Sequence, residues 1–250
     1  CRSVNCSFAN LLVERLVMCE ISSVGFKLSP YLTPILLGWI AGYWLGYFRL
    51  LSLGLDVKPF ERWVVTSSVA APALAYGLNL AFFLVFEGVV THGLMYFGSL
   101  LAFWWLTKVL LASFSDCSKA GSYVNVAVAT TACASCIGRL GCLFAGCCYG
   151  IQINFRLWFI SLENFPSQLL ESFFHFAILT YALFIGKTSF ATKDAFNIYL
   201  TAYCVYRFFA EFLRGDHIGS VYGFSYAQCV ILALALFYFM GKWYEKTGSF

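Results

Sequence analysis

The residues best suited to chemistry lie in one glycine-rich run, GRLGCLFAGCCYG, at residues 138–150. Its arginine, Arg139, has a guanidinium group that suits bidentate binding of phosphate oxygens. Its three thiols, Cys142, Cys147 and Cys148, stand close to that charge in the sequence. A positive charge favours the thiolate form of a nearby cysteine, and the thiolate is the nucleophile. The run therefore combines a group that recognises anions with groups able to form a covalent bond.

The surroundings of Arg139 are apolar, and this makes its presence informative. An arginine in the middle of a membrane span costs about 3 kcal/mol or more unless it faces a partner, a cavity or an anion. We therefore expect a site inside the membrane at Arg139. An amide in the same apolar stretch, Asn125, also needs a partner between helices, and we expect it to support Arg139.

The thiols of the run leave three interpretations open, namely a structural disulfide, close packing and a reactive thiol. A metal site is not expected, because no histidine or carboxylate lies near in the sequence and only three thiols cluster. The chain has 11 cysteines, and in so apolar a sequence most are expected to be small buried side chains. Cys133 and Cys136, one helical turn apart, belong to that packing group.

A second group of polar residues follows Pro166, which suits the first turn of a helix. Gln168 and Glu171 are three positions apart and therefore share a face of that helix. Both are candidate wall residues of the site.

A third group forms a stripe on a later apolar helix, where Arg207, Glu211 and Arg214 recur at positions i, i+4 and i+7. Tyr203 extends the stripe by one turn. An ion-pair ladder that neutralises itself would explain such a stripe in a soluble helix. In a membrane, three arginines against the two glutamates leave positive charge that suits a phosphate or another anionic headgroup.

The composition indicates the kind of fold that must position these candidate residues. Hydrophobic residues make up 61% of the 250 residues and charged residues 11%, with a mean hydropathy of +0.78. Such a chain is expected to be an all-α polytopic membrane protein with a central lipid or headgroup cavity. The net charge of +4 is small and spread between spans, so the sequence does not indicate nucleic-acid binding.

A span needs about 20 apolar residues, and this length divides the chain into seven. The expected spans are 31–50, 63–86, 93–113, 122–146, 167–186, 195–213 and 223–241. Residues 1–30 are expected to form an amphipathic or interfacial segment, 31–241 the seven-span domain and 242–250 a cytoplasmic tail. Lysine and arginine concentrate in the first, third and fifth loops and the tail, which predicts an external N-terminus and a cytoplasmic C-terminus.

Four motifs in this order resemble the bacterial prolipoprotein diacylglyceryl transferase family. They are Gly138-Arg139-Leu140-Gly141, Pro166-Ser167-Gln168-Leu169 with Glu171, Tyr203 with Arg207-Phe208-Phe209-Ala210-Glu211-Phe212-Leu213-Arg214, and Ser225-Tyr226-Ala227-Gln228. Tyr31, seven residues before Gly38, resembles the tyrosine of the family's first span. The resemblance extends from about residue 31 to 240.

The resemblance implies an activity, a location and a role for each matched residue. The family moves the diacylglyceryl group of phosphatidylglycerol to a cysteine of a lipoprotein precursor, in the bacterial inner membrane and with no cofactor. Arg139 and Arg207 would hold the headgroup phosphate, and Glu211 would orient Arg207. Tyr31 and Tyr203 would line the pocket.

The sequence also departs from the family's pattern. Phe97 stands where the family has a histidine often proposed as the base, and Phe165 replaces another histidine. The family's asparagine and Asn-Gly-Glu of the central motif are here Cys142 and Ala145-Gly146-Cys147.

Because of these departures, three functions remain open. The first is a divergent transferase that uses a phospholipid donor and modifies a cysteine or another nucleophile on a protein, with a covalent relay through Cys142, Cys147 or Cys148 as one option. The second is a lipid-binding accessory membrane protein that has lost catalysis. The third is a membrane thiol oxidoreductase, which adjacent cysteines disfavour because their disulfides are strained.

Overall fold

The computed structural model describes residues 32–85, 92–112, 117–157, 160–185, 195–215, 220–221, 224–225, 228–233 and 235–236. The predicted interfacial segment 1–30, Tyr31 and the predicted tail 242–250 lie outside these residues.

Most of the described chain is helical, as predicted. The helices are α2 (Leu32–Ser52), α3 (Lys58–Val85), α4 (His92–Ala112), α5 (Cys117–Phe144), α6 (Ser167–Ile185), α7 (Ala195–Ala210) and the short 3-10 helix η1 (Glu211–Leu213). Residues 228–233 and 235–236 are also helical. Each predicted span therefore contains helical residues.

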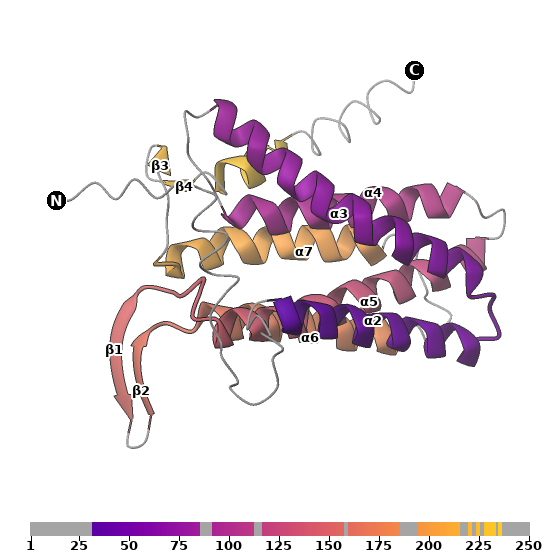
Figure 1. Cartoon of the computed structure of the whole chain (residues 1–250), viewed down its shortest axis with the longest axis horizontal. Coiled ribbons are helices and arrows are strands. Elements are labelled where there is room, and N and C mark those ends of the chain that lie inside the picture. Colours follow the sequence, from indigo (N-terminus) through magenta and orange to yellow (C-terminus); the bar gives the residue numbers. More distant parts are fainter. Residues whose placement is uncertain are drawn as a thin grey trace, which may run out of the picture.

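Two antiparallel hairpins interrupt the helical pattern, and an all-α prediction missed them. The strands are β1 (Gln152–Leu157), β2 (Ile160–Asn164), β3 (Ser220–Val221) and β4 (Phe224–Ser225). The first hairpin extends beyond the ends of the helices (Figure 1). It lies between α5 and α6, in the segment that connects two of the predicted spans.

Two of the described helices are long and apolar enough to cross a bilayer. They are Thr33–Ser52 in α2 and Lys119–Phe144 in α5, with a shorter apolar stretch, Gly98–Leu110, in α4. Helix length and hydropathy therefore do not test the expected seven membrane crossings, and that number stays a prediction. Arg139 lies within the second of the two apolar helices, as the sequence analysis expected.

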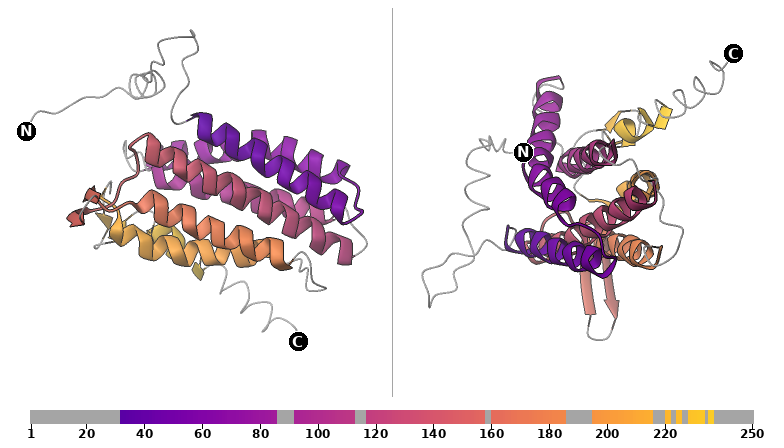
Figure 2. Two further views of the ribbon diagram at one scale, coloured as in Figure 1. Left: turned by 90° about the horizontal axis from the view of Figure 1, so that it is seen from below. Right: turned by 90° about the vertical axis from the view of Figure 1, so that its right-hand side faces the viewer.

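The helices run side by side, and several helix termini lie together at one end of the bundle (Figures 1 and 2). α5 packs between α2 and α6, and α3 packs on α4. The C-terminal ends of α5 and α7 and the N-terminal end of α6 all lie at the end of the bundle where the β1–β2 hairpin projects. Polar residues near these three termini are therefore brought together.

The contact between α2 and α5 depends on small residues. A Cβ atom at Gly42 would lie 2.7 Å from the carbonyl oxygen of Thr130, and one at Gly38 would lie 2.7 Å from that of Ala134. Glycines four residues apart share one face of a helix and let two backbones approach closely. This contact fixes α2 against the helix that contains Arg139.

Gly42→Ala is expected to destabilise the protein by about 1–3 kcal/mol, because the new methyl group would force α2 away from Thr130. The measurement is the thermal unfolding midpoint in one detergent. Gly77→Ala is the matched control, because a Cβ at Gly77 has no neighbour within 4 Å and alanine favours a helix over glycine by about 0.5–1 kcal/mol. An equal midpoint for Gly42→Ala and the wild-type protein would contradict the close packing of α2 on α5.

Candidate functional site

The centre of the candidate site is an ion pair between neighbouring helices. Nη2 of Arg139, on α5, lies 2.8 Å from Oε1 of Glu171, on α6. The hydroxyl of Tyr203, on α7, donates to the same oxygen at 3.0 Å. Glu171 and Tyr203 are buried, so the carboxylate is held by two partners away from water. Three of the predicted residues, from three helices, thus meet at one point.

A second ion pair lies at the end of α7. Nη2 of Arg207 is 2.8 Å from Oε2 of Glu211, and both side chains are buried. The prediction that Arg207, Glu211 and Arg214 share one helix face is wrong for Arg214. The helix α7 ends at Ala210 and is followed by η1, after which the backbone of Arg214 is extended. The side chain of Arg214 is nevertheless buried.

The arginines are close enough to act together on one carboxylate. Arg139, Arg207 and Arg214 all interact electrostatically with Glu171, and the interaction of Arg139 is the strongest of the three. The site therefore concentrates three guanidinium groups in a region with little water.

The glycine-rich loop after α5 is fixed to the start of α6. Nε2 of Gln168 donates to the carbonyl oxygen of Cys147 at 2.6 Å, and the hydroxyl of Ser167 donates to that of Cys148 at 2.6 Å. Gln168 was predicted as a wall residue, whereas Ser167 was only part of a motif. The short helix start that precedes Glu171 thus also positions two of the cysteines.

Gly150 joins this loop to two other segments. Its amide donates to the carbonyl oxygen of Phe165 at 2.8 Å, and the amide of Ile151 donates to that of Leu213 at 2.9 Å. A Cβ atom at Gly150 would lie 2.6 Å from both carbonyl oxygens, so only glycine allows this approach. The junction holds the loop, the hairpin and η1 in fixed relative positions.

The three thiols of the loop gather in space as well as in sequence. The sulfur atoms of Cys142, Cys147 and Cys148 all lie within 4.8 Å of one another. None of the three forms a disulfide in this structure. Hydrogen bonds from the thiols of Cys142 and Cys147 lower the pKa of Cys148, with help from Arg139 and Arg214. The pKa of the Cys147 thiol is raised, chiefly by its hydrogen bonds to Cys142 and Cys148.

Asn125 does not support Arg139, contrary to the prediction. The two residues are 14 positions apart on α5, which places them about 21 Å apart along the helix axis. Asn125 is buried, and neither atom of its amide has a hydrogen-bond partner among the described residues. It belongs to a different level of the bundle from the arginines.

His175, on α6, is a further neighbour of the site. Its Nδ1 lies 3.0 Å from the hydroxyl of Tyr199, and its ring stacks on Tyr203 at a centroid distance of 5.7 Å. It is completely buried. His175 follows Glu171 by four residues and therefore shares its face of α6. This spacing is the sequence signal that places His175 next to the ion pair.

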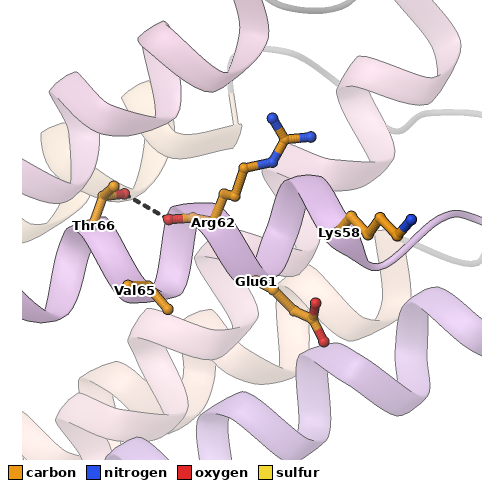
Figure 3. A pocket seen from close by; sticks show the side chains of 5 residues that line it. All are labelled: Lys58, Glu61, Arg62, Val65 and Thr66. Carbon is orange, nitrogen blue, oxygen red and sulfur yellow. Dashed lines mark hydrogen bonds between the residues drawn. The ribbon is translucent and has the colours of Figure 1, made fainter.

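A pocket of about 450 Å³ lies elsewhere, along α3. It is lined by Lys58, Glu61, Arg62, Val65 and Thr66, which belong to the first turns of that helix (Figure 3). It does not include the arginine cluster, so the predicted central headgroup cavity stays a prediction. The side chain of Phe97 and all of Tyr31 lie outside the described residues.

Comparison with known proteins assigns the chain to a family. The family model described as prolipoprotein diacylglyceryl transferase matches residues 19–244, which is most of the chain. The chain belongs to the prolipoprotein diacylglyceryl transferase family. This confirms the resemblance found in the sequence motifs and is consistent with a membrane protein.

Several relatives bear the name phosphatidylglycerol–prolipoprotein diacylglyceryl transferase. One from Clostridium perfringens is 28% identical over 159 residues, covering 60% of this chain and 59% of the relative. One from Clostridium tetani is 30% identical over 118 residues, covering 44% and 47%. One from Dehalococcoides mccartyi is 28% identical over 178 residues, covering 66% and 65%. The matched part is thus less than two thirds of each of these relatives. No solved structure matches the chain.

In this member of the prolipoprotein diacylglyceryl transferase family, Arg139 and Glu171 are expected to be energetically coupled. Either Arg139→Leu or Glu171→Gln leaves a buried partner without its counterpart, whereas the double variant removes both charges. We expect a coupling free energy of about 1–3 kcal/mol in a double-mutant cycle of unfolding. Arg139→Leu combined with Glu61→Gln, on α3, is the control and should be additive. Additivity of the Arg139 and Glu171 variants would mean that the ion pair does not stabilise the bundle.

Proposed function

We propose that this chain is a membrane transferase that moves a diacylglyceryl group from phosphatidylglycerol to the thiol of a cysteine in a protein acceptor. The observation that supports this most directly is the group of three arginines that act on Glu171, of which Arg207 and Arg214 are buried, in a chain of this family. Guanidinium groups bind phosphate oxygens in a bidentate manner and stabilise negative charge in regions that exclude water. Phosphatidylglycerol is the donor named in the relatives.

In this proposal Arg139 and Arg207 bind the phosphate of the donor. A guanidinium group has five N–H donors, so a bond from Arg139 to Glu171 is compatible with further bonds to phosphate. Glu171 and Glu211 would each orient one arginine, and Tyr203 would fix Glu171. Gln168 and Arg214 would complete the wall near the glycine-rich loop, with Tyr31 as a further lining residue.

The chemical step is a substitution at the glyceryl carbon. A bond forms between the acceptor sulfur and that carbon, and the bond from the carbon to the phosphate oxygen breaks. The electron pair leaves with the phosphate oxygen as glycerol phosphate, and the thiol proton passes to water. Arg139 and Arg207 stabilise the negative charge that develops on the leaving group.

The cysteine cluster has a less direct part in this proposal than the arginines. A relay through Cys142, Cys147 or Cys148 would form a thioether on the protein. A second thiol would then have to displace a thiolate, which is a poorer leaving group than a phosphate ester. We therefore favour direct transfer to the acceptor and treat an adduct on the cluster as the sign of a relay.

We also propose the membrane arrangement that the sequence predicted. The chain would cross the bacterial inner membrane seven times, with its N-terminus outside and its C-terminus in the cytoplasm. The end of the bundle with the β1–β2 hairpin would then face outward. An acceptor exported across the membrane would meet the site from that side.

A lipid-binding accessory role is the second candidate. The observation that favours it is that Phe97 and Phe165 stand where the family resemblance leads one to expect histidines. Such a protein would keep the arginines and bind phospholipid without transferring any group. A membrane thiol oxidoreductase built on Cys147 and Cys148 is the third candidate.

The purified full chain, placed in vesicles that contain phosphatidylglycerol, is expected to add a diacylglyceryl group to a lipoprotein-type peptide with one cysteine. Intact mass spectrometry measures the adduct on the peptide and on the protein. Arg139→Gln and Arg207→Gln should each lower kcat/KM for transfer by about 100-fold or more, because each removes stabilisation of the leaving phosphate. Arg62→Gln, which removes the same charge at an exposed position on α3, should leave transfer unchanged.

Two further controls separate the candidate functions. A peptide with serine in place of cysteine, or vesicles that contain only phosphatidylethanolamine, should give no adduct. Bound phosphatidylglycerol without any adduct on peptide or protein would overturn the transferase proposal and favour the accessory role.

A further inference from the structure

The cluster of Cys142, Cys147 and Cys148 has a geometry that the proposed phosphate chemistry does not explain. Zinc–sulfur bonds of about 2.3 Å in a tetrahedral site place two sulfur atoms about 3.8 Å apart. The three sulfur atoms here all lie within 4.8 Å of one another. Small side-chain rotations would therefore allow all three to bind one ion.

The backbone fixes this geometry in advance. Cys148 has a φ angle of +60° and Gly146 one of +65°, so the loop turns sharply between the three cysteines. A left-handed conformation is unfavourable for a residue other than glycine and persists only where its surroundings impose it. Here Ser167 and Gln168 bind the carbonyl groups of Cys148 and Cys147, and these bonds fix the backbone from which both thiols project.

The donor set indicates which metal suits the cluster. Three thiols with no carboxylate or imidazole favour a thiophilic ion such as zinc over magnesium, calcium or manganese. The sequence alone did not favour a metal, because only three thiols cluster, but three protein ligands are the number found in catalytic zinc sites, in which the fourth position stays open for water or substrate. Cys142 is buried, whereas Cys147 and Cys148 are partly exposed, so a fourth ligand would approach past the latter two.

The neighbouring charges are compatible with such an ion. Zinc with three thiolates has a net charge of −1, so the nearby guanidinium groups would stabilise the complex rather than oppose it. Arg139 and Arg214 both act electrostatically on Cys148. The ion would thus lie next to the arginines proposed to bind the donor phosphate.

We propose that Cys142, Cys147 and Cys148 form a zinc site whose fourth position binds the acceptor thiol. The assignment of the fourth ligand rests on the proposed transferase function, whereas the three-cysteine site does not. Zinc deprotonates a thiol that coordinates to it, and the proton passes to water. The bound sulfur then forms the bond to the glyceryl carbon while the phosphate oxygen leaves. The ion thereby supplies the activation of the thiol that Phe97 cannot supply as a base.

Cobalt is the spectroscopic probe for this site. The full chain, reduced and freed of metal in phosphatidylglycerol vesicles, should bind one Co²⁺ with the thiolate-to-cobalt absorption of a tetrahedral site. Equimolar Zn²⁺ should displace the cobalt and abolish that absorption. Cys142→Ser, Cys147→Ser and Cys148→Ser should each weaken cobalt binding at least tenfold.

Two variants keep this result interpretable. Cys133→Ser, on the same helix as Cys142 but in the predicted packing group, should bind cobalt as the wild-type protein does. Cys148→His keeps a zinc ligand and should retain one Co²⁺ per chain with about one third less thiolate-to-cobalt absorption, since two sulfur bonds replace three. A Cys148→His protein that is folded but binds no metal would contradict the site.

The fourth position is tested by adding the acceptor peptide to the cobalt-loaded protein. The thiolate-to-cobalt absorption should rise by about one third as a fourth sulfur binds, and a peptide with serine in place of cysteine should cause no rise. A reduced wild-type protein that binds neither Co²⁺ nor Zn²⁺, or binds only Cu⁺, would overturn the zinc site. Metal binding without a response to the cysteine peptide would overturn the role of the acceptor thiol.

Failure of this inference differs from failure of the proposed function. Diacylglyceryl transfer that persists in the metal-free protein would refute the zinc mechanism and leave the transferase intact. A cobalt site that binds the cysteine peptide in a protein without transfer activity would refute the transferase and leave the metal site intact.

Discussion

The structure depends first on Arg139, whose charged side chain is largely enclosed within the apolar helix bundle. A charge in that position is tolerated only if it is neutralised and hydrogen-bonded, and Glu171 meets both needs at 2.8 Å. This requirement sets α6 against α5. Because Tyr203 donates to the same carboxylate, α7 is drawn to the same point. The Glu171 carboxylate thus joins three helices at one point.

The start of α6 has a second structural task that links the ion pair to the thiols. Ser167 and Gln168 hold the glycine-rich loop, and Glu171 follows one turn later on the same helix. A movement of α6 would therefore shift the carboxylate and the loop together. Ligand binding at the arginines would be mechanically coupled to the cysteine cluster through this one turn. Such coupling needs no long pathway, because the two sites share a single rigid element.

The sequence predicted the helices and most of the polar residues that meet, but not how they pair. Apolar stretches of sufficient length located the helices in the part of the chain that the structure describes, and motif order identified the family. Periodicity shows which residues share a face of one helix and does not show which helix packs against it, so the bond from Tyr203 to Glu171 could not be derived. The same lack of tertiary information led to the wrong expectation that Asn125 supports Arg139, although helix rise alone separates them by about 21 Å. The stripe through Arg214 failed because α7 gives way to η1, a change that spacing does not reveal.

The departures from the family's pattern all concern groups that could activate the acceptor thiol or surround Arg139. The chain has phenylalanine where a base is expected, and thiols where an amide and a carboxylate are expected. If the arginines alone were retained, the donor phosphate would be bound but the acceptor thiol would stay protonated for most of the time at neutral pH, since an ordinary thiol has a pKa near 8.5. A site that has lost its base must therefore activate the acceptor by another route or abandon transfer. The three converging thiols lie beside Arg139, and in the proposed membrane arrangement they lie at the end of the bundle that an exported acceptor would approach.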